Sequence, residues 1–157
     1  MKKILVVCLG NICRSPAAEA IFDQLILKHD LSQQIKVDSA GTSGYHVGEL
    51  PDSRMRAELE SHGYAPCKSH SRQINLADFS EYDHILVMDK SNFNNVITLT
   101  SQEEQQNKVE MMTDYADESL GRDFIPDPYY GGQEGFAEVI SLLENSIYNF
   151  LNRHNQI

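Results

Sequence analysis

Cys8 and Arg14 are the two residues whose types and spacing point most directly to chemistry. Five residues separate them in the string VCLGNICRSP, residues 7–16. A free thiol has a pKa of about 8.5, but beside an arginine at a helix N-terminus the value falls to roughly 3.5–7.5. A thiol in that setting is ionised at neutral pH. We therefore expect Cys8 to act as a thiolate nucleophile on a group that Arg14 helps to bind.

The loop between Cys8 and Arg14 has the residue types of an anion-binding site. It lacks the second glycine followed by Lys-Ser/Thr that a Walker phosphate loop requires. Gly10 and Asn11 tolerate the left-handed conformations of a tight concave loop. Inward-pointing amides and the dipole of a following helix would then bind phosphate, while Arg14 offers a planar fork to two oxygens. We expect phosphate contacts or support from Leu9, Gly10, Asn11, Ile12, Cys13 and Ser15, with Ser15 donating to the sulfur of Cys8.

The residues on either side of this loop predict a strand and a helix. Residues 3–7 form a short branched apolar run, which is typical of a strand buried on both faces. Ser15 and Pro16 then predict a helix start, with serine as N-cap and proline as the first helical residue. A loop at the carboxyl end of a parallel strand is where such sheets bind their ligands.

The rest of the chain alternates in the same way. Further strands are predicted at residues 35–40, 84–88 and 109–112, and helices at 53–61, 89–99 and about 136–151. This alternation predicts an α/β fold, an open four-stranded parallel sheet with helices on both faces. We find no linker or repeat, so residues 1–157 are expected to form one domain.

Composition excludes several classes of partner. The chain has 13 Lys and Arg against 23 Asp and Glu, for a net charge of −10, which disfavours nucleic acid and anionic membranes. No apolar run approaches the roughly 18 residues of a membrane-spanning helix. We expect a cytoplasmic protein that is a monomer by default. An anionic substrate therefore requires a strongly positive local site.

The cysteines and histidines predict neither a disulfide framework nor a metal site. Three cysteines are an odd and small number, and the six histidines show no zinc-type spacing. We expect no metal and no cofactor. For Cys13 two roles stay open, a small packed residue or a thiol that forms a disulfide with an oxidised Cys8.

The string VCLGNICRSPAAEA resembles the signature of the low-molecular-weight protein tyrosine phosphatases. Further matches follow in the family's order across essentially the whole chain: Asp38 to Thr42, Arg72-Gln73, Asp78-Phe79, Tyr82-Asp83, Met88-Asp89 and Asp127 to Gly131. The resemblance implies a flavodoxin-like fold and hydrolysis of phosphotyrosine in proteins. It also implies a phosphocysteine intermediate on Cys8 and no cofactor.

Asp127 lies between Pro126 and Pro128, whose rings restrict its backbone. By residue type alone, such an aspartate is most often a turn residue. The resemblance implies instead that Asp127 is the general acid and then the general base. It further implies that Tyr45, Tyr129 and Tyr130 form the pocket walls, and that the tyrosine pair can be phosphorylated.

The resemblance also implies a hydrogen-bond network of Asn11, Ser15 and Ser39 that supports the loop. The family places a histidine three residues before the Arg-Gln pair, where this chain has Ser69, with His70 one position later. Either residue is a candidate for that role. Asp89 is a candidate for holding the loop and for capping the helix that follows it.

Three alternative functions share parts of this sequence pattern. An arsenate reductase relays electrons through closely placed cysteines, and Cys67 has no such partner. A protein-arginine phosphatase resembles this family but has Thr at the position of Ile12. A non-catalytic phosphopeptide-binding module would have lost the nucleophile, the arginine or the acid, and this chain keeps all three. The expected partner is a phosphotyrosine protein, and for a bacterial source the family suggests an autophosphorylating tyrosine kinase.

Overall fold

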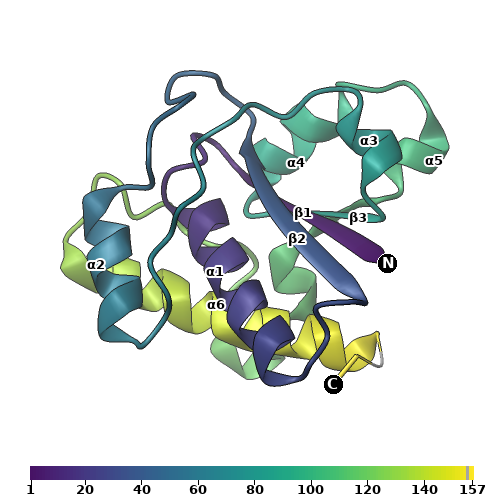
Figure 1. The fold of residues 1–157 in the computed structure, drawn as a ribbon. Helices are drawn as coiled ribbons and strands as arrows, with labels where there is room; N and C mark the ends of the chain where they lie inside the picture. Colours follow the sequence, from purple (N-terminus) through teal and green to yellow (C-terminus); the bar gives the residue numbers. More distant parts are fainter. Residues whose placement is uncertain (155) are drawn as a thin grey trace.

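Four short apolar segments form one parallel sheet in the computed structural model, which describes residues 1–154 and 156–157 (Figure 1). The strands are β1 (Lys2–Cys8), β2 (Ile35–Gly41), β3 (His84–Val87) and β4 (Val109–Met111). Their order in the sheet is β2-β1-β3-β4, and every pair is parallel. The predicted fold class, an open four-stranded parallel sheet, is therefore confirmed.

Helices cover both faces of this sheet (Figure 1). The α-helices are α1 (Arg14–Lys28), α2 (Ser53–Ser61), α3 (Asp78–Glu81), α4 (Lys90–Ile97), α5 (Glu103–Gln106) and α6 (Gln133–Arg153), and two 3₁₀ helices are η1 (Met112–Tyr115) and η2 (Glu118–Leu120). No helix in the described part of the chain is both long and apolar enough to cross a membrane.

The alternation of side chains along β1 divides the core into two clusters. Ile4, Val6 and Cys8 face a large cluster built with α1, α2 and α6. Leu5 and Val7 face a smaller cluster on the opposite side, built with α3 and α4. Residues 4–8 are all buried, as the continuous apolar run predicted. The sheet thus fixes the position of Cys8 from both sides.

The start of α1 differs from its prediction. The helix begins at Arg14 with Cys13 in the N-cap position, so Ser15 is already helical and does not cap it. The prediction of Ser15 as N-cap was wrong because the hydroxyl points inward and bonds to Cys8 and Asn11. α2 matches its predicted range, and α4 begins one residue after the predicted start because Asp89 is its N-cap.

The carboxyl ends of β1 and β2 lie side by side. Cys8 pairs with Gly41 across the parallel ladder. A Cβ atom on Gly41 would lie 2.7 Å from the carbonyl oxygen of Leu9, so a larger residue would displace the loop. Glycine at the end of β2 therefore allows the loop after β1 to pass close by.

Candidate active site

The thiol of Cys8 lies at the bottom of a cradle formed by the loop after β1. Cys8 is 3% exposed. The backbone N–H of Asn11 points at its sulfur at 3.3 Å, and the hydroxyl of Ser15 lies 3.1 Å from it. Both are donors to a thiolate, and the N-terminus of α1 begins at the same place. The two predicted features of the loop, a donor from Ser15 and a helix N-terminus behind the sulfur, are therefore both present.

Asn11 holds the loop in its concave shape. Its φ of 56° is in the left-handed region, which non-glycine residues seldom adopt. The side-chain amide donates to Ser15 Oγ at 2.8 Å, and the side-chain oxygen accepts from the backbone N–H of Arg72 at 2.9 Å. Ser71 adds a further bond, from its hydroxyl to the carbonyl of Gly10 at 3.0 Å. The loop is thus supported by a chain segment about 60 residues away.

Ser39 does not bond to Asn11 or Ser15 as the predicted network required. Its hydroxyl donates to Glu19 on α1 at 2.6 Å, and the other oxygen of Glu19 accepts from Ser69 at 2.9 Å. Burial raises the pKa of Glu19, and the two hydroxyls oppose that rise. Both candidates for the histidine position are exposed, and of the two it is Ser69 that makes this contact. Ser39 and Ser69 therefore fix the helix behind the loop.

The guanidinium of Arg14 is buried and oriented by two acceptors. Its Nη1 donates to Asp89 at 2.6 Å and to the carbonyl of Ile125 at 2.9 Å. The other oxygen of Asp89 accepts from the backbone N–H of Asn92 and caps α4. Asp89 thus has both of the roles that the sequence left open. Because Nη1 is committed, Nε and Nη2 are the donors that remain for a substrate.

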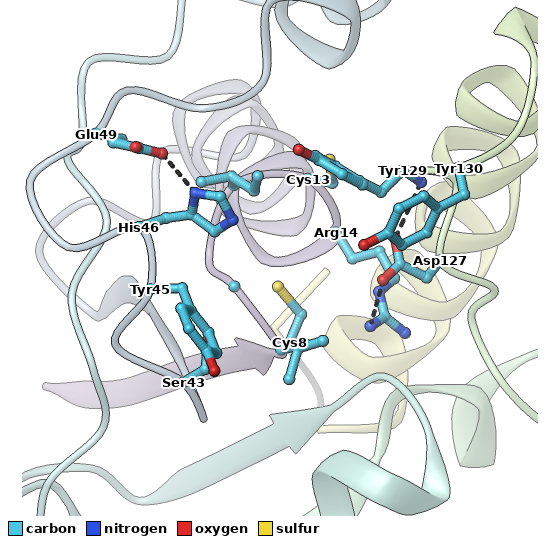
Figure 2. A pocket seen from close by; sticks show the side chains of 13 residues that line it. Cys8, Cys13, Arg14, Ser43, Tyr45, His46, Glu49, Asp127, Tyr129 and Tyr130 are labelled. Atoms are coloured by element: carbon cyan, nitrogen blue, oxygen red, sulfur yellow. Dashed lines mark hydrogen bonds and ion pairs between the residues drawn. The ribbon is translucent and has the colours of Figure 1, made fainter.

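Asp127 lies beside Arg14 on the segment before α6. Its carboxylate is 3.6 Å from Arg14 Nη2 and also accepts from the backbone N–H of Tyr129 at 3.1 Å. Figure 2 shows Asp127 and Arg14 facing each other next to Cys8. The structure therefore places together the three predicted catalytic side chains, from positions 8, 14 and 127.

These groups share a pocket of about 430 Å³. Its lining consists of Cys8, Leu9, Gly10, Ile12, Cys13, Arg14, Ser43, Tyr45, His46, Glu49, Asp127, Tyr129 and Tyr130. Tyr45 and Tyr130 stand at the mouth with 91% and 93% of their surface exposed. The ring of Tyr129 packs against Tyr130 at a centroid distance of 4.9 Å and is half-buried. The three tyrosines predicted as walls therefore all line the pocket that holds the thiol of Cys8 (Figure 2).

His46 and Glu49 also line the pocket, although the sequence did not predict a role for them. The imidazole Nδ1 of His46 lies 2.6 Å from a carboxylate oxygen of Glu49. The ring also packs over the loop, since a Cβ on Gly10 would come within 3.0 Å of it. Both residues follow Tyr45 closely in the chain, so their nearness to a predicted wall residue was the available signal.

Cys13 has surroundings opposite to those of Cys8. It is 4% exposed, and its pKa is raised well above the usual range by burial, by the carboxylate of Asp52 and by Cys8. All three cysteines of the chain are free. Cys13 is thus a protonated thiol at neutral pH, suited to packing below the loop. Among the described residues no cluster of His, Cys, Asp or Glu has the arrangement of a metal site.

The fold and this site match one protein family. A family model described as low molecular weight phosphotyrosine protein phosphatase matches residues 3–156. The chain belongs to this family, as the resemblance of its motifs indicated.

Individual relatives align with this chain over most of their length. A putative low molecular weight protein-tyrosine-phosphatase of Synechocystis is 48% identical over 149 residues, covering 95% of this chain and 94% of that protein. The human low molecular weight phosphotyrosine protein phosphatase is 41% identical over 139 residues, covering 88% and 86%. A crystal structure of a protein tyrosine phosphatase from Entamoeba histolytica superimposes with a TM-score of 0.94 at 40% identity, covering 99% and 98%.

Proposed function

We propose that this chain hydrolyses phosphotyrosine in proteins in two steps, with Cys8 as nucleophile. In the first step the sulfur of Cys8 attacks phosphorus, and the bond from phosphorus to the phenolic oxygen breaks. Asp127 gives its proton to that oxygen as it leaves. The loop amides and the Nε and Nη2 donors of Arg14 bind the phosphoryl oxygens while charge develops on them.

The second step returns the enzyme to its starting state. Asp127, now ionised, takes a proton from a water molecule that attacks phosphorus. The bond between phosphorus and sulfur breaks, phosphate leaves and Cys8 is again a thiolate. Ser15, 3.1 Å from the sulfur, donates a hydrogen bond that stabilises the leaving thiolate. The chemistry needs no redox change.

The shape of the pocket supports phosphotyrosine as the substrate. The sulfur lies at the buried end of a pocket whose mouth carries Tyr45 and Tyr130, with Tyr129 beside them. A flat phenyl ring fits between aromatic walls and carries phosphorus to the recessed sulfur. The shorter side chain of phosphoserine would leave its phosphorus out of reach.

We also propose an oligomeric state, a location and a partner for the enzyme. We propose that it acts as a monomer, because Cys8, Arg14 and Asp127 all come from one chain. Its free thiols support a reducing, cytoplasmic location. If the source is bacterial, the proposed partner is an autophosphorylating tyrosine kinase.

The observation that carries this proposal is the convergence of the Asn11 amide and the Ser15 hydroxyl on Cys8 Sγ beside Arg14. The test is steady-state hydrolysis of an aryl phosphate from about pH 4.5 to 8, in chelator, by wild type and Cys8→Ser. We expect a bell-shaped profile that Cys8→Ser abolishes. Matched phosphotyrosine, phosphoserine and phosphoarginine peptides define the substrate, and hydrolysis of the phosphoserine peptide at an equal rate would contradict the pocket argument.

A further inference from the structure

The N-terminus of α2 contacts both halves of the site. The backbone N–H of Asp52 donates to the carbonyl of Ile12 in the phosphate loop at 2.7 Å. Two residues later, Nη2 of Arg54 donates to the carbonyl of Tyr129 at 3.0 Å, two residues after Asp127. One short stretch of chain therefore connects the loop of the nucleophile with the segment of the proton donor.

Arg54 is held firmly enough to act as a support. Its Nε and Nη2 bond to the two carboxylate oxygens of Asp52 at 3.1 and 2.9 Å, and Asp52 also accepts from the backbone N–H of Arg54. The guanidinium carbon lies 5.4 Å from the ring centre of Tyr129 and 4.8 Å from that of the buried Phe136. A planar cation stacked between rings and paired bidentately has little freedom to move.

The segment that carries Asp127 has few other supports. Residues 126–131 bond among themselves, through Asp127 to the N–H of Tyr129 and through the N–H of Gly131 to Pro128. In the described chain, Arg54 is the only side chain from another element that hydrogen-bonds to the backbone of this segment. That bond joins the backbone of the segment to α2, while the contact of Asp127 with Arg14 involves the side chain alone.

We propose that Arg54 is a positioning residue, which holds residues 126–131 so that the carboxyl group of Asp127 stays aimed at the leaving oxygen. This inference rests on the proposed function, in which Asp127 is the proton donor. A shift of about 1 Å in a reacting group is enough to cost a large factor in rate. Arg54 contacts no reacting atom in this account and acts through Tyr129.

The test is the dependence of kcat/KM on the leaving group. With a well-placed acid, departure of a basic phenol is assisted, so phenyl phosphate reacts nearly as fast as the ester of a more acidic nitrophenol. We expect Arg54→Met to lower kcat/KM for phenyl phosphate about tenfold, and to affect the nitrophenyl ester much less. The inhibition constant of inorganic phosphate should stay unchanged, because the phosphate loop keeps its own contacts.

Three further variants control this comparison. Arg56→Met removes a neighbouring arginine of the same helix and should behave as wild type, because within the described residues its side chain hydrogen-bonds only to the carbonyl of Pro51. Arg54→Lys keeps a donor for Tyr129 but loses the planar fork, so partial recovery is expected. In an Asp127→Asn background, Arg54→Met should have no further effect on the leaving-group dependence, because the two residues act in one step.

The outcomes test the positioning role of Arg54 separately from the role of Asp127 as proton donor. If Asp127→Asn does not steepen the dependence of kcat/KM on the acidity of the leaving phenol, Asp127 is not the proton donor. The proposed role of Arg54 is then wrong as well. If Asp127→Asn steepens it but Arg54→Met does not, the assignment stands and only the positioning role is overturned. Equal losses for both esters, or weaker phosphate binding, would likewise overturn it, since they indicate damage to the phosphate loop. Circular dichroism and thermal melting confirm that each variant is folded.

Discussion

The buried guanidinium of Arg14 lies 2.6 Å from Asp89, and the same carboxylate caps α4 through Asn92. One aspartate therefore orients the phosphate-binding arginine and starts a helix. Arg14 is 2% exposed, so its charge depends on fixed partners rather than on water. Asp89 lies two residues after Val87, the last residue of β3, so it connects the arginine to the sheet.

Substitution at Asp89 separates these two roles. Asn is as good an N-cap as Asp but is neutral, so Asp89→Asn should keep the cap and destabilise the fold only by leaving the buried charge of Arg14 without its ion pair, while kcat/KM falls about tenfold or more. Asp89→Ala also removes the cap and should lose about 1 kcal/mol of unfolding free energy in addition. Aryl phosphate kinetics and urea unfolding measure the two effects. Wild-type kcat/KM in Asp89→Asn would show that the ion pair does not orient Arg14.

Ser15→Ala tests the second chemical step. The hydroxyl of Ser15 lies 3.1 Å from the sulfur that must leave phosphorus. Its loss should slow breakdown of the phosphocysteine, so kcat should fall about tenfold while kcat/KM changes less. Rapid-mixing experiments should then show a larger burst of phenol before the steady state. Equal decreases in kcat and kcat/KM would place the effect of Ser15 in the first step instead.

Asn11 supports the loop with its backbone conformation and with its side chain, and two variants distinguish these contributions. Asn11→Gly tolerates the φ of 56° but loses the bonds to Ser15 and Arg72. Asn11→Ala loses the same bonds and adds the left-handed strain of about 1 kcal/mol. We expect both to be less stable than wild type by about 2 kcal/mol or more, with Ala below Gly. Urea unfolding at neutral pH gives the order, and an alanine variant as stable as the glycine variant would contradict the strain argument.

The carboxyl group of Asp23 on α1 should make stability depend on pH. Asp23 is exposed at the edge of a surface cavity that it shares with Glu19, where partial desolvation, and then the Glu19 carboxylate, raises its pKa to about 6. Since its unfolded pKa is about 3.9, the folded state retains a proton that the unfolded state has lost. The resulting stabilisation is complete below pH 4 and is lost as the pH rises through 6.

Asp23→Asn should therefore be more stable than wild type at pH 7 and should reduce the decline in stability between pH 4 and 6. Urea unfolding at several pH values measures this dependence. Glu104→Gln, on the exposed surface of α5, is the control and should follow wild type. An unchanged pH dependence in Asp23→Asn would mean that another group, with Glu19 the first candidate, retains the proton.

The parts of the fold with a strong local signal could be predicted from sequence. The apolar run of β1 and the periodic apolar positions of α6 both lie where the pattern put them. The short helices α3 and α5 span four residues each, too few for a helical period to be visible. The start of α1 was misplaced because Ser15 has the residue type of a cap while its hydroxyl serves Cys8.

In the site, prediction succeeded where one motif holds the chemistry and failed where segments far apart in sequence meet. Cys8 and Arg14 lie within one loop, and Asp127 followed from the resemblance. Glu19, whose oxygens join Ser39 and Ser69, has the residue type of an ordinary exposed helix position. The contacts of Arg54 depend equally on chain packing, since its partner Tyr129 lies 75 residues further along the chain.

The most direct test of the account is to identify the residue that carries the phosphoryl group during turnover. Wild-type enzyme is mixed with excess aryl phosphate, quenched within milliseconds and mapped by peptide mass spectrometry. We expect a phosphoryl group on Cys8 that disappears when substrate is exhausted and is absent from Cys8→Ser. A phosphoryl group on any other side chain, or hydrolysis by Cys8→Ser at the wild-type rate, would contradict it.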